Sequence, residues 1–274
     1  MKPALSLRDR LRAQLADLKM PGALEALDDI LAGLDGGALQ SPAAIEALLG
    51  AQIALRNNRR LEAAMRSSRL PVVKTLRDFD FSFQPSIDER QVKELATLAF
   101  VHQAANLVLL GPPGVGKTHL CVALGMEAIS QGLGVYFVTA HALVEDLRKA
   151  YAENRLERRM RVYIAPRLLL IDEVGYLKMD SVAATLFFQL VSARYERGSI
   201  VLTSNKSFGE WAEIFGDPVI ATAILDRLLH HSHVINIRGE SYRLREKKRA
   251  GLYASPVLRP DAISRTQGGM PTSP

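Results

Sequence analysis

Residues 111–118, GPPGVGKT, have the types and spacing of a loop that binds phosphate groups. Glycines at this spacing let backbone N–H groups turn inward around an anion, and a helix that follows presents its positive end to the same anion. Lys117 adds a full positive charge near the outer phosphates, and the Thr118 hydroxyl is suited to bind Mg²⁺. The sequence therefore predicts a site for a nucleoside triphosphate with Mg²⁺. The expected nucleotide contacts are Gly111, Pro112, Pro113, Gly114, Val115, Gly116, Lys117, Thr118 and His119.

Two acidic residues follow a run of apolar residues in LLLIDE, which ends at Asp172 and Glu173. A buried strand would deliver both to its carboxyl end, the edge at which α/β sheets bind ligands. Asp172 is then suited to the shell of Mg²⁺, and Glu173 to accept a proton from an attacking water or to orient it. A strand that simply ends in exposed acids is the alternative, which the phosphate-binding loop upstream disfavours.

Two further residues are weaker candidates. Asn205 ends the apolar run VLTSN, where its amide could reach the outer phosphate or the attacking water, although Ser-Asn also commonly opens a turn without function. Arg227 lies near the end of an expected helix, where an arginine usually compensates the helix dipole or is solvated.

Strand and helix patterns alternate from residue 86 onward. Four apolar runs are separated by helical segments, which indicates a parallel sheet between helices, and a helix over 118–129 follows the glycine-rich loop. The expected strands are 107–110, 135–140, 167–173 and 199–205, with a final strand at 233–237. This strand–loop–helix context disfavours a glycine turn that binds nothing.

The rest of the chain divides by composition. Residues 1–68 repeat Leu, Ala and Ile at helical spacing, which predicts a small all-helical domain for DNA or partner binding. Residues 69–85 lose that period and read as a basic, extended linker into a domain over 86–250. Residues 251–274 are rich in Pro and Gly and are expected to be disordered.

Composition favours a globular, cytoplasmic protein. The chain has 274 residues, 48% of them hydrophobic, and a single cysteine, Cys121, which cannot form an intramolecular disulfide. No apolar stretch is long enough for a membrane span, so no membrane partner is expected. The net charge of +6 points to a polyanionic partner. Where the positive charge lies along the chain matters more than its total.

The excess of positive charge is concentrated at residues 56–77. Helical spacing of arginines there could follow a phosphate backbone, whereas a solvated basic helix is the alternative. The DNA contacts that this cluster predicts are Arg56, Arg59, Arg60, Arg66, Arg69 and Lys74. HHSH at 230–233 invites a metal interpretation, but its three histidines do not share one helical face.

Together, the segments GPPGVGKTHL, RLLLIDEVGYL, VLTSN, LDRLLHHSHVINIRGESYR and RNNRRLEAAMRSSRLPVVKTLRDFDF resemble the IstB-like ATP-binding proteins of insertion sequences. The likeness runs from about residue 7 to residue 249. It implies an AAA+ ATPase fold related to DnaC and DnaA, with no C-terminal lid or a minimal one. It also implies a homo-oligomer that holds ATP at subunit interfaces, assembles on double-stranded DNA and assists an IstA-like transposase in target capture.

The resemblance also assigns roles to particular residues. Lys117 and Thr118 match the Walker A motif, Asp172 and Glu173 match Walker B, Asn205 matches sensor 1 and Arg227 matches the arginine finger. Arg243 is a candidate sensor 2, and Phe79 or Phe81 could lie near the adenine or in the core between the domains. A DnaC-like helicase loader, a small-molecule kinase and a DNA scaffold without turnover are the alternative functions.

Overall fold

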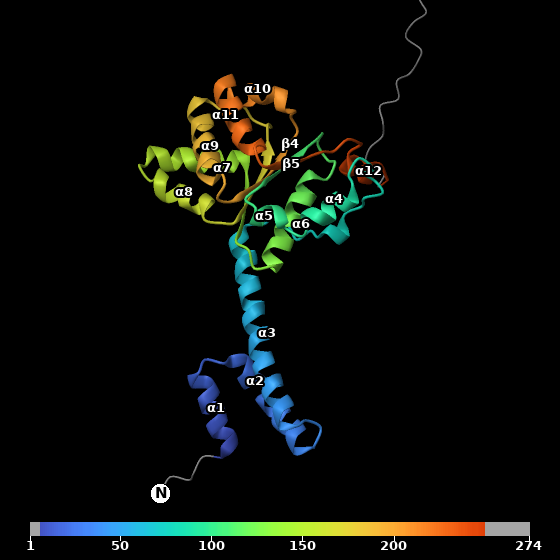
Figure 1. Ribbon diagram of the computed structural model, residues 1–274, viewed down its shortest axis with the longest axis vertical. Coiled ribbons are helices and arrows are strands. Elements are labelled where there is room, and N and C mark those ends of the chain that lie inside the picture. The colour runs from blue at the N-terminus through green and yellow to red at the C-terminus, as the bar shows by residue number, and fades with distance from the viewer. Residues whose placement is uncertain (1–5, 250–274) are drawn as a thin grey trace, which may run out of the picture.

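Five parallel strands form the central sheet of the computed structural model, which describes residues 6–249 (Figure 1). The strands are β1 (Asn106–Leu110), β2 (Val135–Thr139), β3 (Leu168–Val174), β4 (Ser199–Ser204) and β5 (Ser232–Asn236). Their order across the sheet is β2-β3-β4-β1-β5. The prediction of a parallel sheet is confirmed, with each strand starting or ending within two residues of the expected bounds.

Helices cover both faces of this sheet, so its central strands are apolar on both sides. Alternate residues of β1 enter separate cores, with Leu107 and Leu109 in one and Val108 and Leu110 in the other. The first core is completed by α4 (Glu89–Leu95), α5 (Ala99–His102) and α6 (Lys117–Ser130). The second is completed by α7 (Ala140–Ala152), α8 (Leu156–Ile164), α9 (Ser181–Arg194), α10 (Trp211–Phe215) and α11 (Pro218–Leu229).

The N-terminal helices project away from the sheet, as Figure 1 shows in blue. They are α1 (Leu7–Asp17), α2 (Pro21–Asp35) and α3 (Ser41–Ser68). Gly22 permits α2 and α3 to pack closely, because a Cβ atom there would lie 2.8 Å from the Ala51 carbonyl oxygen. At about 1.5 Å per residue, α3 is roughly 40 Å long, and it also contacts β2 and α6. One continuous helix thus joins the N-terminal helices to the sheet.

The segment after α3 contains one turn of 3₁₀ helix, η1 (Leu76–Asp78), which contacts α6. After β4 comes a second such turn, η2 (Phe208–Glu210), and after β5 comes α12 (Tyr242–Arg249). The disorder expected for residues 251–274 concerns a segment outside the described residues. Within 6–249, every helix is too short or too polar to cross a membrane.

Candidate nucleotide site

The backbone of the loop at 111–118 adopts conformations that require its glycines. Gly111, Gly114 and Gly116 have φ values of +144°, +84° and +102°, a region that other residues rarely adopt. A Cβ atom on Gly111 would lie 2.3 Å from the Ile237 carbonyl oxygen. Gly116 precedes the first residue of α6, so the loop opens directly onto the positive end of that helix.

The Lys117 side chain folds back into the phosphate-binding loop and is buried there. Its ammonium group donates hydrogen bonds to the carbonyl oxygens of Gly111 (2.6 Å) and Pro112 (2.8 Å), and only 7% of the residue is exposed. Burial is the main cause that lowers the pKa of Lys117 to about 8; the Asp172 charge opposes this shift, and the Arg243 charge contributes to it. The loop therefore confines a cation that an anionic ligand would stabilise in its charged form.

Thr118 and Asp172 bring three oxygen atoms together between α6 and β3. The Thr118 hydroxyl lies 3.0 Å from both carboxylate oxygens of Asp172, a residue only 4% exposed. A buried carboxylate beside a hydroxyl is a donor set for a hard divalent cation, and Mg²⁺ typically binds one or two such groups together with phosphate oxygens. The residues present therefore fit the expected Mg²⁺.

Glu173 differs from its neighbour in being exposed to solvent. Its φ of +66° is unusual for a residue other than glycine, and the pairing of β3 with β4 is irregular between Ile171 and Val174. A bulge of this kind re-aims a side chain at the edge of a sheet. Glu173 lines a cavity of about 410 Å³ together with Tyr176, whose pKa is raised by burial and then by the Glu173 charge.

Asn205 lies directly after β4 and faces the loop that follows Glu173. Its side-chain oxygen is 3.1 Å from the position that a Cβ atom of Gly175 would occupy. Among the residues described, this buried oxygen has no hydrogen-bond partner. An unpaired buried amide at the carboxyl edge of the sheet fits a site whose remaining partners belong to a ligand or to water.

Arg227 lies in the last turn of α11, away from the phosphate-binding loop. Its guanidinium is 4.6 Å from the ring centroid of Phe188 and donates a hydrogen bond to the Ala223 carbonyl oxygen (3.3 Å). No hydrogen bond or ion pair joins it to 111–119, 172–173 or 205 in the described structure. The structure thus joins Thr118 to Asp172 and places Glu173 and Asn205 at the ends of the neighbouring strands β3 and β4, whereas Arg227 makes its contacts on α9 and α11.

The segment after β5 lies against the phosphate-binding loop, through contacts of Ser241 and Tyr242 that the sequence did not predict. The Tyr242 N–H donates a hydrogen bond to the Gly114 carbonyl oxygen (3.0 Å), and a Cβ atom on Gly114 would meet the Ser241 hydroxyl. The Arg243 charge is close enough to lower the pKa of Lys117. This placement is compatible with the sensor 2 role considered for Arg243.

The segment before α4 contacts the other side of the same loop. Phe79 is buried against Gly116, and its ring meets the His119 ring edge to face at a centroid distance of 5.2 Å. One nitrogen of His119 lies 2.9 Å from the Thr75 carbonyl oxygen. The Phe81 ring packs against the Phe79 ring in a tilted arrangement, with a centroid distance of 4.9 Å. The chain that leads from α3 therefore packs directly against the start of α6.

The basic residues of the predicted DNA cluster are exposed along α3 and after it. Arg66 makes an exposed ion pair with Glu62 (3.6 Å), which leaves most of its surface in solvent. Arg69 differs from the others, because its guanidinium lies 5.4 Å from the ring centroid of Tyr136 on β2. Phosphate contacts are therefore sterically open to Arg56, Arg59, Arg60, Arg66 and Lys74, whereas Arg69 also packs on the sheet domain.

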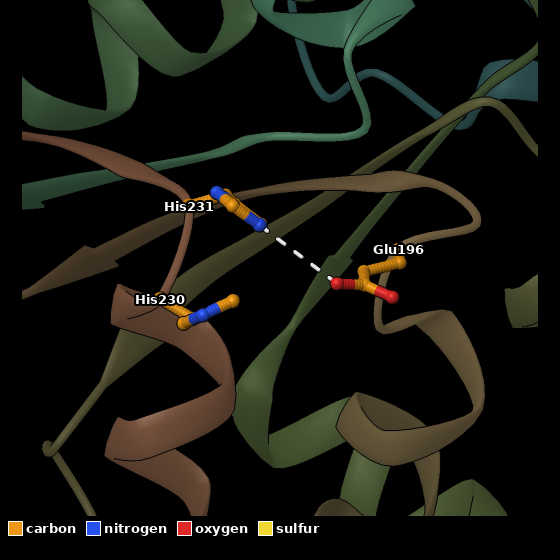
Figure 2. Close-up of side chains that lie close together, drawn as sticks. All are labelled: Glu196, His230 and His231. Atoms are coloured by element: carbon orange, nitrogen blue, oxygen red, sulfur yellow. Dashed lines mark ion pairs between the residues drawn. The ribbon is translucent and has the colours of Figure 1, made fainter.

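The histidines at 230–231 meet Glu196 on the surface, as Figure 2 shows. Their nearest nitrogen and carboxylate oxygen atoms lie within 4.8 Å of one another. Each histidine already has a partner, since His231 pairs with Glu196 (3.8 Å) and His230 hydrogen-bonds to the Tyr195 hydroxyl (2.8 Å). The cluster precedes β5 and therefore lies at the amino edge of the sheet, opposite the phosphate-binding loop.

Fold and site together define the class of protein. The strand order, the glycine loop after β1 and the acids at the end of β3 are those of an AAA+ P-loop protein. AMPPCP-bound DnaA from Aquifex aeolicus has a TM-score of 0.51 and 22% identity, covering 69% of this chain and 59% of that one. DnaI has a TM-score of 0.51 and 22% identity, covering 63% of this chain and 90% of that one.

The family is narrower than this class. Residues 13–250 match the model of the IstB-like ATP binding protein family, and the chain belongs to that family. It is 54% identical to the ATP-binding protein of insertion sequence IS5376 from Geobacillus stearothermophilus, covering 73% of this chain and 80% of the relative. It is 56% identical to the ATP-binding protein of insertion sequence IS21 from Pseudomonas aeruginosa, covering 72% of this chain and 74% of the relative. The resemblance drawn from the motifs is confirmed.

Proposed function

We propose that this protein is a Mg²⁺-dependent ATPase that oligomerises on duplex DNA and assists an IstA-like transposase in selecting target DNA. The observation that carries the proposal is the arrangement of Lys117, Thr118 and Asp172 at one edge of the sheet, with Glu173 beside them. The membership of the chain in an ATP-binding family of insertion sequences supports the same activity.

Each residue has a chemical role in this proposal. Lys117 and the loop N–H groups bind the phosphates, while Thr118 and Asp172 hold Mg²⁺, which neutralises charge on the phosphate oxygens when bound. Glu173 accepts a proton from the attacking water, because it is an exposed carboxylate that directly follows the Mg²⁺ ligand Asp172. Asn205 orients that water or the outer phosphate from the adjacent strand.

Arg227 acts on the ATP of a neighbouring copy in this proposal. A cation near the transferring phosphate stabilises the charge that develops in the transition state. Arg227 is held by Phe188 on a surface apart from its own phosphate-binding loop, which favours action on another subunit. Homo-oligomerisation then becomes a condition for turnover.

DNA binding is proposed for the exposed basic residues of α3 and the linker. Arg56, Arg59, Arg60 and Arg66 lie on the long helix that joins the N-terminal helices to the sheet domain, and Arg69 and Lys74 follow it. The chain continues from this helix to Thr75 and Phe79, which pack against the start of α6. This continuity gives DNA bound at α3 a direct physical connection to the ATP site.

The transposase and a cytoplasmic location belong to the same proposal. The relatives are proteins of insertion sequences, mobile DNA that needs a transposase to move. Cys121 is buried, and burial raises the pKa of its thiol, so the free cysteine is shielded from reaction.

A helicase loader is the alternative function. It would prefer single-stranded DNA and would bind a hexameric helicase, so the preference for single or double strands distinguishes the two functions.

Steady-state ATPase activity with and without duplex DNA tests the proposal. We expect Mg²⁺-dependent turnover that rises with duplex DNA more than with single strands. Glu173→Gln keeps the shape of the side chain but removes the proton acceptor, so it should bind ATP, lose at least about 100-fold in turnover and retain DNA longer. Turnover in this variant equal to the parent would refute the role of Glu173. Stimulation by single strands alone would favour helicase loading.

A further inference from the structure

Thr203 lies on β4, opposite the two acids of β3, and is 1% exposed. Its hydroxyl donates a hydrogen bond to one carboxylate oxygen of Asp172 (2.5 Å). The Thr203 hydroxyl oxygen also accepts a hydrogen bond from the backbone N–H of Glu173 (3.0 Å). One hydroxyl therefore contacts the side chain of the first acid and the backbone of the second.

The irregular pairing of β3 and β4 explains why a side chain is needed here. Regular pairing holds from Leu168 to Ile171 and is broken until Val174 pairs with Ser204. The Glu173 N–H consequently has no strand carbonyl as its partner, and a buried N–H without a partner is strongly unfavourable. The Thr203 hydroxyl replaces the missing carbonyl and holds Glu173 at its φ of +66°.

Asp172 has a second hydroxyl contact, but it comes from the nucleotide side. The Thr118 hydroxyl, which is the expected Mg²⁺ ligand, lies 3.0 Å from both carboxylate oxygens. Thr203 approaches from the neighbouring strand β4. When Thr118 binds the metal, Thr203 is the hydroxyl that still fixes the carboxylate, and such support of a ligand typically changes metal affinity or activity by about 10- to 100-fold.

We propose that Thr203 is a positioning residue for ATP hydrolysis, which orients Asp172 toward Mg²⁺ and Glu173 toward the attacking water. This inference rests on the proposed ATPase activity. It requires a hydroxyl at position 203, since a methyl group can neither donate to the carboxylate nor accept from the Glu173 N–H. Bulk and burial alone do not meet the requirement.

The test compares Thr203→Val, which keeps the shape, with Thr203→Ser, which keeps the hydroxyl. We expect Thr203→Val to lower kcat at least about tenfold and to raise the half-saturating Mg²⁺ concentration, with KM for ATP within about twofold of the parent. Thr203→Ser should stay within about threefold of the parent in kcat. Thr185→Val is the matched control, because Thr185 is exposed on α9 and bonds only to the Ser181 carbonyl oxygen.

The outcomes separate this inference from the proposed function. A parent protein without ATPase activity would contradict the proposed function. A parent that hydrolyses ATP beside a folded Thr203→Val variant of equal kcat and equal Mg²⁺ dependence would overturn the role of Thr203 alone. If Thr203→Val does not fold, the comparison passes to Thr203→Ser and Thr203→Ala, which differ by the hydroxyl. Equal turnover of those two would overturn it as well.

Discussion

The charge of Lys117 depends on its ligand. Burial lowers the pKa of the free side chain to about 8, whereas a bound polyanion favours the protonated form and raises the pKa again. The bound state therefore holds more protons than the free state above about pH 8, and affinity for ATP must fall as pH rises through that value.

This linkage gives a prediction for nucleotide binding. Affinity for a fluorescent ATP analogue should be about twofold weaker at pH 8 and about tenfold weaker at pH 9 than at pH 7. Lys117→Ala should bind at least about tenfold more weakly at pH 7, because the charge is lost. It should also lose the dependence on pH. Parent affinity that does not change between pH 7 and pH 9 would contradict the assignment.

Sequence reasoning was strongest for residues in local motifs. Gly111, Lys117 and Asp172 could be proposed as site residues because a phosphate-binding loop and the acids at a strand end have a characteristic spacing along the chain. Thr203 could not be found in this way. Its role depends on a bulge in the neighbouring strand and on the pairing of β3 with β4, and neither leaves a mark in the local sequence.

Arg194, at the end of α9, joins several elements at the amino edge of the sheet. It is 1% exposed and donates hydrogen bonds to five backbone carbonyl oxygens, and burial lowers its pKa to about 10. Those carbonyls belong to Tyr163, Ile164, Pro166, Arg167 and Ser199. A basic residue in a last helical turn looks like an exposed charge, so this role could not be predicted from the sequence.

Arg194→Met should destabilise the fold by at least about 3 kcal/mol, because several buried carbonyls lose their donor. The variant keeps most of the side-chain volume, so packing changes little. Urea denaturation followed by circular dichroism measures the change in free energy of unfolding. Arg197→Met, three residues on and exposed, serves as the control and should change it by less than about 0.5 kcal/mol. Equal stability of the two variants would show that the five hydrogen bonds contribute little.

The basic face of α3 carries the proposed DNA contact. Replacing Arg59, Arg60 and Arg66 by Ala should weaken binding to all duplex sequences alike. It should also reduce the slope of log affinity against log salt by about 2 to 3. ATPase activity without DNA should be spared. A control with three exposed cations elsewhere replaces Arg90, Lys93 and Arg197. If both triple variants bind DNA as the parent does, the α3 cluster is only a solvated surface.

Elements were predictable to different degrees. The apolar runs of β1 and β3 are buried on both faces, so their composition alone marks them as central strands. The linker was expected to be extended and basic, and its contacts with the start of α6 were not foreseen. Phe79 reaches Gly116 and His119 only because the chain folds back over the loop. A contact between segments so far apart leaves no periodic pattern in the sequence from which it could be predicted.

At the scale of the whole molecule, one copy does not bring together every group that the proposed chemistry needs. Glu173 and Arg227 lie on different surfaces, with Arg227 packed on Phe188. A complete site on this account takes Glu173 from one copy and Arg227 from the next. Each of the variants Glu173→Gln and Arg227→Ala should therefore bind ATP nearly normally yet be almost inactive alone.

The most direct test is the steady-state ATPase activity of a one-to-one mixture of these two variants on duplex DNA. A Glu173→Gln copy can offer its intact Arg227 to the intact Glu173 of an Arg227→Ala neighbour, so some interfaces regain both groups. The account predicts activity clearly above the sum of the two separate variants. Activity that stays additive, in a mixture shown by crosslinking to co-assemble, would place Arg227 outside the active interface and contradict a site shared between copies.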